Sequence, residues 1–181
     1  MYNLLVIDPP WPKQKGGRRS TRPNQGRALD YQTMSIIEIF ALLDTKIFPL
    51  TLTPHTVFMW ATEEFLSSCE HQMASRNYRR HCRMVWNKTN GIAPAFSVRF
   101  SHEYLLWFYK PKFTPVHPAC RGKFTTVFTE KPREHSRKPD IAYSMIKEMF
   151  PDATCLDVFS REDRPGWDVW GDECGKFNQP E

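Results

Sequence analysis

Long apolar runs are missing from this sequence of 181 residues. No stretch of eighteen or more apolar residues occurs, so we expect no membrane-spanning helix. The chain passes from Met1 almost directly into the short apolar run Leu4–Ile7, without a basic region or a long apolar core. We therefore expect no secretion signal and a cytoplasmic location.

Glycine and cysteine are also sparse. None of the eight glycines falls in a Gly-x-Gly pattern, and no phosphate-binding loop ending in Gly-Lys-Ser/Thr occurs. The sequence therefore lacks the usual motifs of enzymes that catalyse nucleotide-dependent hydride or phosphoryl transfer. The five cysteines are odd in number and widely spaced, which argues against a disulfide framework. His117 and Cys120 have the spacing of half a zinc site, but no second pair follows, so we expect no metal.

The composition is that of a single soluble domain. Hydrophobic residues make up 40% and charged residues 25% of the chain, which is ordinary for a globular protein. The length suits one domain and is too short for two ordinary ones, so we expect one domain over residues 1–181. The net charge of +5 and the pI of about 9.0 indicate an anionic partner.

Apolar runs and helical periodicities alternate along the chain. We expect strands over residues 3–7, 56–61, 82–88, 103–110 and 154–159. Helices are expected from the capping-box residue Ser35, over 63–76, and from Asp140 to about Phe150. The alternation predicts an α/β fold with a mostly parallel sheet. Ligands of such sheets bind beyond the carboxyl ends of strands, here the loops after Ile7 and Phe159.

Positive charge is concentrated in two stretches that contain no acidic residue. Residues 76–88 form one of them. The other falls within the expected loop over residues 8–33 and supplies six cations, Lys13, Lys15, Arg18, Arg19, Arg22 and Arg27. We interpret this loop as a nucleic-acid contact, because uncompensated cations bind phosphates. The alternative is a solvated flexible loop, which is the usual role of a charge run.

The sequence Asp8-Pro9-Pro10-Trp11 follows the first expected strand. The two prolines remove two amide donors and leave their carbonyls as rigid acceptors. With the Asp8 carboxylate they suit the two N–H groups of a planar aromatic amine, whose ring would stack on Trp11. Accepting both hydrogens favours a nucleophilic amine nitrogen and stabilises the charge that develops on it. The alternative is an ordinary turn at the end of a strand.

The chain resembles the MT-A70 family of amino-group methyltransferases. The resemblance rests on Asp8-Pro9-Pro10-Trp11 and on segments 29–35, 58–62, 86–90, 103–106, 136–140, 158–161 and 167–171, in that order. Arg137 departs from the pattern, since the family usually has histidine there. The resemblance implies a Rossmann-like methyltransferase fold, S-adenosylmethionine as methyl donor and the exocyclic amine of adenine as acceptor.

The resemblance also implies roles for individual residues. Asp8, Pro9 and Pro10 would hold the target amine, Trp11 would wall the base pocket, and Tyr31 would lie in the loop over it. Lys138 would bind the donor's carboxylate and Arg161 its ribose. The remaining donor contacts would come from Ile7, Asp8, Phe159, Asp172 and Glu173.

Several substrates stay open at this stage. DNA is the first expectation, since the chain is compact, and adenine in a duplex would have to flip out of the stack to reach Asp8. RNA is the alternative, and a catalytically inactive nucleic-acid-binding scaffold of the same fold is another. A methyltransferase of free nucleotides or small amines would have no use for the basic loop. No segment is long enough for a separate target-recognition domain, so a homodimer or a partner subunit is an expected aid to recognition.

Overall fold

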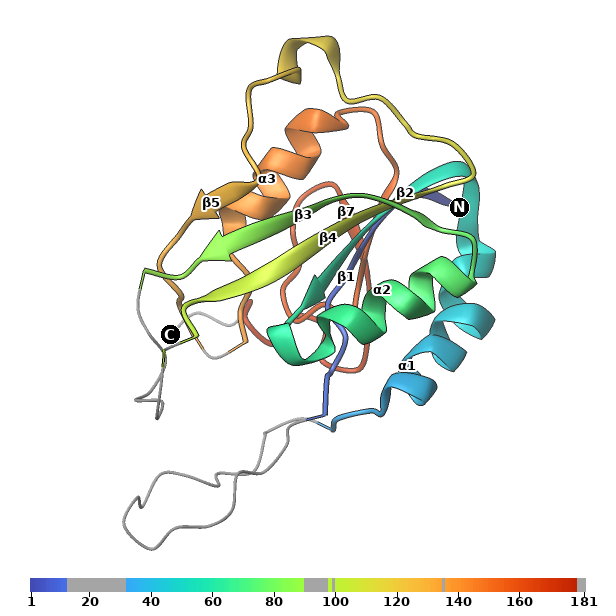
Figure 1. Ribbon diagram of the computed structural model, residues 1–181, viewed down its shortest axis with the longest axis vertical. Coiled ribbons are helices and arrows are strands. Elements are labelled where there is room, and N and C mark those ends of the chain that lie inside the picture. Colours follow the sequence, from blue (N-terminus) through green and yellow to red (C-terminus); the bar gives the residue numbers. More distant parts are fainter. Residues whose placement is uncertain (13–31, 90–97, 99, 135, 179–181) are drawn as a thin grey trace, which may run out of the picture.

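The computed structural model describes residues 1–12, 32–89, 98, 100–134 and 136–178, and Figure 1 shows the arrangement of their elements. A seven-stranded sheet has the order β5-β3-β4-β2-β1-β6-β7. Its strands are β1 Tyr2–Ile7, β2 Thr51–Ala61, β3 Arg79–Asn87, β4 His102–Lys110, β5 Val127–Thr129, β6 Cys155–Val158 and β7 Trp167–Trp170. Strand β4 runs antiparallel to β2 and β3, and the other neighbouring pairs are parallel.

Helices cover both faces of this sheet. One face carries α1 Ile36–Leu42, a π-helical turn Leu43–Ile47 and α2 Leu66–Ser75, and the other carries α3 Asp140–Met149 (Figure 1). Short 3₁₀ turns occupy Phe48–Leu50, Glu63–Phe65 and Pro118–Cys120. None of the helices in the described ranges is long and apolar enough to cross a membrane.

The apolar run of β1 shows why both faces are covered. Leu4 and Val6 pack in the core beneath α3, whereas Leu5 and Ile7 pack in the core beneath α1 and α2. All four side chains are buried, as expected for a central strand of a parallel sheet. The expectation of a Rossmann-like α/β fold is confirmed.

The expected elements are present with shifted ends, and two strands were missed. The reciprocal hydrogen bonds between Ser35 and Glu38 form the expected capping box at α1. β5 was missed because three residues give too short a pattern, and β7 because its tryptophans lie in a polar tail. Both strands join the sheet through long-range pairing with β3 and β6, which local sequence does not encode.

The site is positioned by the strand β1. This strand lies between β2 and β6, so the strand order reverses here: strands β2 to β5 lie on one side of β1, and strands β6 and β7 lie on the other. Such a reversal opens a crevice beyond the carboxyl ends of the strands. The amide of Asp8 donates to the Val158 carbonyl at 3.1 Å and fixes the first residue after β1 against the end of β6.

Candidate active site

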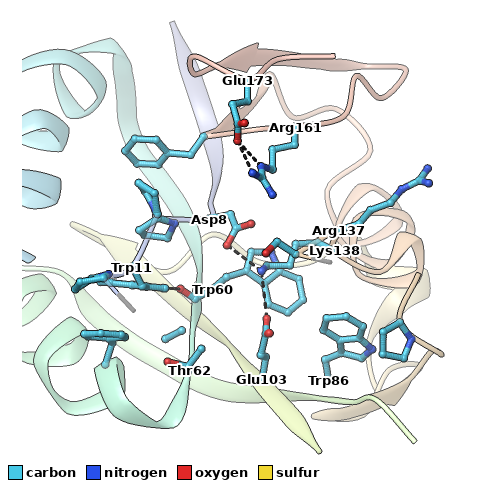
Figure 2. Close-up of a pocket in the computed structure, with 18 of the residues that line it drawn as sticks. Asp8, Trp11, Trp60, Thr62, Trp86, Glu103, Arg137, Lys138, Arg161 and Glu173 are labelled. Atoms are coloured by element: carbon cyan, nitrogen blue, oxygen red, sulfur yellow. Dashed lines mark hydrogen bonds and ion pairs between the residues drawn. The ribbon is translucent and has the colours of Figure 1, made fainter. Parts of the chain in front are cut away.

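A cavity of about 1020 Å³ opens at the carboxyl ends of β1, β2 and β6. Figure 2 shows part of its lining. Nine residues predicted from the sequence take part, namely Asp8, Pro9, Pro10, Trp11, Lys138, Phe159, Arg161, Asp172 and Glu173. The fold thus brings both ends of the chain to one site, as the strand-end rule predicts.

Among the predicted site residues that the structure describes, Ile7 does not line this cavity. Ile7 is fully buried in the core beneath α1 and α2, so its side chain does not reach the cavity. Its predicted contact with the donor stays a prediction. Tyr31 and the six cations between Lys13 and Arg27 lie outside the described residues.

The turn after β1 holds its carbonyl groups in place by backbone hydrogen bonds. The Pro9 carbonyl accepts the Trp11 amide at 2.8 Å, and the Pro10 carbonyl accepts the Met34 amide at 3.0 Å. The proline carbonyls are therefore already hydrogen-bonded, a point that the sequence interpretation did not foresee. Each carbonyl oxygen keeps a second lone pair, so each can still accept a further hydrogen bond.

Trp11 is fixed from two sides. Its indole Nε1 donates to the Trp60 carbonyl at 3.1 Å, and its ring stacks on Phe65 with centroids 5.0 Å apart and planes 7° from parallel. Trp11, Trp60 and Phe65 all line the cavity. The aromatic wall is consequently rigid before any ligand binds, which is the condition for orienting a flat ring.

Charges of alternating sign cross the cavity (Figure 2). The ammonium Nζ of Lys138 lies 3.0 Å from Asp8 Oδ1 and 3.2 Å from Glu103 Oε2. Glu103 also pairs with Lys88 through its other oxygen. Sequence reasoning missed Glu103 and Lys88 as site residues. The available signal was an acidic residue opening an otherwise apolar strand, Glu103 followed by Tyr104-Leu105-Leu106.

Burial and pairing set the ionisation of these groups. Burial raises the pKa of Asp8 above its ordinary value, Lys138 opposes this, and Glu103 adds to it. Burial acts to raise the pKa of Glu103 as well, but Lys138 and Lys88 outweigh it, and the pKa of Glu103 is lowered. Burial acts to lower the pKa of Lys138, but Asp8 and Glu103 raise it above its ordinary value. Lys138 therefore stays protonated at neutral pH.

Arg161 and the C-terminal segment form the opposite wall. Arg161 Nε donates to Glu173 at 2.7 Å, and a second guanidinium N–H donates to the same oxygen. Phe159 has a φ of 61°, and its amide donates to the Trp170 carbonyl at 2.6 Å. A Cβ on Gly171 would lie 3.0 Å from the Phe159 Cα, so glycine is required for this close approach.

A buried polar cluster lies behind this wall and was not predicted. Asp157 of β6 accepts hydrogen bonds from Ser160 at 2.8 Å and from Tyr143 at 3.3 Å. Arg164 lies 3.5 Å from the same carboxylate and 3.7 Å above the Tyr143 ring. Burial raises the pKa of Asp157 to about 7, against the lowering effects of Ser160 and Arg164. Asp157 thus titrates near neutral pH.

The start of α3 is occupied by a side chain of the protein itself. The amides of Asp140 and Ile141 donate to the two carboxylate oxygens of Glu130 at 3.0 and 2.9 Å. A helix N-terminus attracts anions, so a free one at this place could add to the attraction of Lys138 for the donor's carboxylate. In the structure Glu130 takes that place, which leaves the ammonium of Lys138 as the cation for such a group.

The second basic stretch is partly neutralised by acids from other elements. Arg76 pairs with Asp44, and Arg80 and Arg83 both pair with Glu70. This stretch contains no acidic residue in the sequence, but folding supplies part of its counter-charge. The basic character of residues 76–88 is therefore weaker in the fold than in the sequence.

These features together describe an α/β methyltransferase fold with a charged and aromatic cavity at its strand ends. The family model of MT-A70 matches residues 2–173, and the chain belongs to the MT-A70 family. The resemblance seen in the sequence motifs is confirmed.

Relatives of several kinds are similar to this sequence. N6-methyladenosine RNA methyltransferase MTA1 of Cryphonectria parasitica is 29% identical, over 100% of this chain and 54% of the relative. Type II methyltransferase M.MunI of Mycoplasma sp is 26% identical, over 94% of this chain and 76% of the relative. N(6)-adenine-specific methyltransferase METTL4 of Mus musculus is 25% identical, over 97% of this chain and 38% of the relative. The chain spans about half the length of the MTA1 proteins that it matches.

Proposed function

We propose that this protein transfers a methyl group from S-adenosylmethionine to the exocyclic amine of adenine in DNA. The observation that carries the proposal is the turn Asp8–Trp11, whose carboxylate, proline carbonyls and stacked indole line one cavity. Asp8 accepts one N–H of the amine and the Pro9 carbonyl accepts the other, through its free lone pair. The amine lone pair is thereby withdrawn from conjugation with the ring, and Asp8 stabilises the positive charge that develops on nitrogen. As the nitrogen bonds to the methyl carbon, the carbon–sulfur bond would break with its electron pair going to sulfur, which becomes a neutral thioether. The methylated nitrogen would then release one proton to solvent.

The cavity lining fits the chemistry of the donor. When bound, S-adenosylmethionine supplies a methyl group on a sulfonium centre. Lys138 has three N–H donors, and within the described residues Asp8 and Glu103 take two of them, so one remains for a carboxylate. Arg161, Asp172 and Glu173 offer polar groups for ribose hydroxyls, and Phe159 an apolar surface.

DNA is kept as the first expectation for the substrate, and the nucleic-acid contact rests on charge. Relatives of the chain are named both as a type II methyltransferase and as an RNA methyltransferase, so the substrate is tested directly. We propose the six cations between Lys13 and Arg27 as phosphate contacts, since they are adjacent in sequence to the turn at Asp8. A homodimer or a partner subunit is proposed to assist recognition.

The test uses labelled S-adenosylmethionine with single- and double-stranded DNA and RNA of one sequence. Mass spectrometry of the digested polymers then identifies the methylated nucleoside. We expect N6-methyladenine in DNA. Methylated RNA with unmodified DNA would assign the alternative substrate. If no polymer were methylated although the protein bound DNA, the inactive scaffold would replace the enzyme.

A further inference from the structure

Four charged side chains from four parts of the fold form a row that ends at Asp8. Lys88 follows β3, Glu103 lies in β4, Lys138 precedes α3, and Asp8 follows β1. Consecutive members are paired, so the signs alternate along the row. The side chains are only 8, 17, 11 and 17% exposed in that order, so solvent screens them weakly.

Lys138 is shared almost evenly between two carboxylates. Its Nζ lies 3.0 Å from Asp8 and 3.2 Å from Glu103. Lys138 lies in the irregular segment between β5 and α3, so regular backbone pairing does not fix it. Glu103, in contrast, is held in β4 opposite Trp86 of β3. Glu103 therefore sets how closely the ammonium approaches Asp8.

Lys88 controls how strongly Glu103 attracts Lys138. The Lys88 amide donates to the Ser101 carbonyl at 2.8 Å, and its ammonium lies 4.7 Å from the centre of the Trp86 ring. These contacts hold its charge at Glu103. With Lys88 in place, Glu103 is partly neutralised and draws Lys138 less strongly from Asp8.

We propose that Glu103 and Lys88 are positioning residues. Together they set how strongly the Lys138 ammonium interacts with Glu103 and how strongly with Asp8, so that the Asp8 carboxylate is ionised but still accepts the target amine. This inference rests on the proposed function, in which Asp8 holds that amine. Neither Glu103 nor Lys88 touches the reacting nitrogen. Both act through Lys138.

The surroundings of Asp8 define what each variant changes. Lys138 and Arg161 lower its pKa, and Glu103 raises it in addition to burial. Asp157 and Tyr143 are the other titratable groups whose ionisation is coupled to the Asp8 charge. In Glu103→Gln, the Lys138 ammonium has lost its contact with the Glu103 carboxylate and interacts more strongly with Asp8. The pKa of Asp8 therefore falls. With Lys88→Met, Glu103 draws Lys138 away, so the pKa of Asp8 rises.

The experiment measures methyl transfer against pH for the parent protein, Glu103→Gln, Lys88→Met and the double variant. We expect the acidic limb of kcat/KM to move down by about one pH unit in Glu103→Gln and up by a similar amount in Lys88→Met. In Glu103→Gln the kcat falls about 10-fold or more, because the amine must displace Lys138 from Asp8. Glu70→Gln, which removes a carboxylate paired with Arg80 and Arg83, is the control and moves neither quantity.

The double variant separates positioning from stability. Glu103→Gln alone leaves Lys88 buried without its carboxylate, which destabilises the fold, whereas the double variant removes both charges. We expect the double variant to melt close to the parent and to keep the lowered kcat. Recovery of the parent kcat in the double variant would overturn the proposal, because the stranded Lys88 would then explain the loss.

A second readout is independent of turnover. Carbon-13 NMR titration of the Asp8 carboxyl gives its pKa directly in each folded variant. Opposite shifts in Glu103→Gln and Lys88→Met support the proposal, and unchanged or parallel shifts overturn it. If the two variants showed these opposite shifts but the parent protein methylated nothing, the proposed function would be contradicted. The effect of Glu103 and Lys88 on the Asp8 carboxyl would still be established.

Discussion

The Lys138 ammonium lies 3.0 Å from the Asp8 carboxylate although the two residues belong to opposite parts of the sequence. The contact joins the end of the first strand to the segment before the last helix, at the point where the strand order reverses. It places a cation beside the carboxylate that we assign to the target amine. A buried carboxylate would otherwise favour its neutral form, which is a poor acceptor for two amine hydrogens.

The pH dependence of the reaction follows from this pairing. Burial raises the pKa of Asp8 above 3.8, and the amine requires the ionised carboxylate. We expect kcat/KM to fall as the pH drops through that raised pKa, so its acidic limb lies above the ordinary aspartate value of 3.8. A pH–rate profile checks this, with the fold monitored by circular dichroism at each pH. An acidic limb at or below the ordinary aspartate value would remove Asp8 from the assigned role.

Trp11 provides a test of the base pocket. Trp11→Ala removes the ring that stacks on Phe65, and we expect the KM for nucleic acid to rise about 10-fold, since stacking of one base contributes about 1–3 kcal/mol. Trp11→Phe keeps a flat ring but loses the bond to the Trp60 carbonyl, so its KM should change less. Steady-state kinetics with saturating donor measures both. Equal effects of the two variants would show that ring stacking is not what Trp11 contributes.

The burial of Asp157 leads to a prediction about how stability depends on pH. Its pKa is raised from 3.8 to about 7 in the folded protein. As the pH rises from about 4 to 7, the unfolded chain releases this proton while the folded protein retains it. The stability contributed by the protonated carboxyl is therefore present below pH 4 and is lost by about pH 7. Asp157→Asn lacks this loss and should gain stability relative to the parent across that window.

Urea denaturation at several pH values measures the difference in the free energy of unfolding. Asp168→Asn is the control, since Asp168 lies exposed in β7. Its difference from the parent should vary much less with pH. A flat difference for Asp157→Asn would mean that the carboxyl ionises at an ordinary pH in the folded protein.

The cations of residues 13–27 should determine the salt dependence of nucleic-acid binding. Replacing Arg18, Arg19 and Arg22 by alanine should reduce the slope of log K against log salt by about one for each phosphate that is no longer neutralised. Donor binding should not change. Arg80→Ala with Arg83→Ala is the control, because these arginines already pair with Glu70. A weaker affinity for the donor, with an unchanged slope, would contradict the assignment of this stretch.

Part of this site could be predicted from the sequence because its motifs stand at strand ends. Asp8 and Arg161 each follow an apolar run, and parallel strands bring their carboxyl ends to one edge. The hydrophobic pattern and the turn residues are local signals, and they were sufficient for these positions. The resemblance to MT-A70 supplied the role of Lys138.

The remainder depends on contacts between distant segments. The pairing of Glu103 with Lys88 and Lys138 requires the antiparallel register of β3 and β4, which no local pattern specifies. Similarly, the counter-charges of residues 76–88 come from Asp44 and Glu70, so a run of cations in sequence became a set of ion pairs. The side chain of Ile7 is buried because helices cover both faces of β1, so its predicted contact with the donor stays a prediction.

The most direct test of the central claim compares Asp8→Asn with the parent protein in two measurements. Asn retains the shape of Asp8 but replaces the anionic acceptor by an amide. We expect the methylation of adenine to fall at least about 100-fold, while calorimetry still detects binding of S-adenosylmethionine. Undiminished formation of N6-methyladenine by Asp8→Asn would contradict the account.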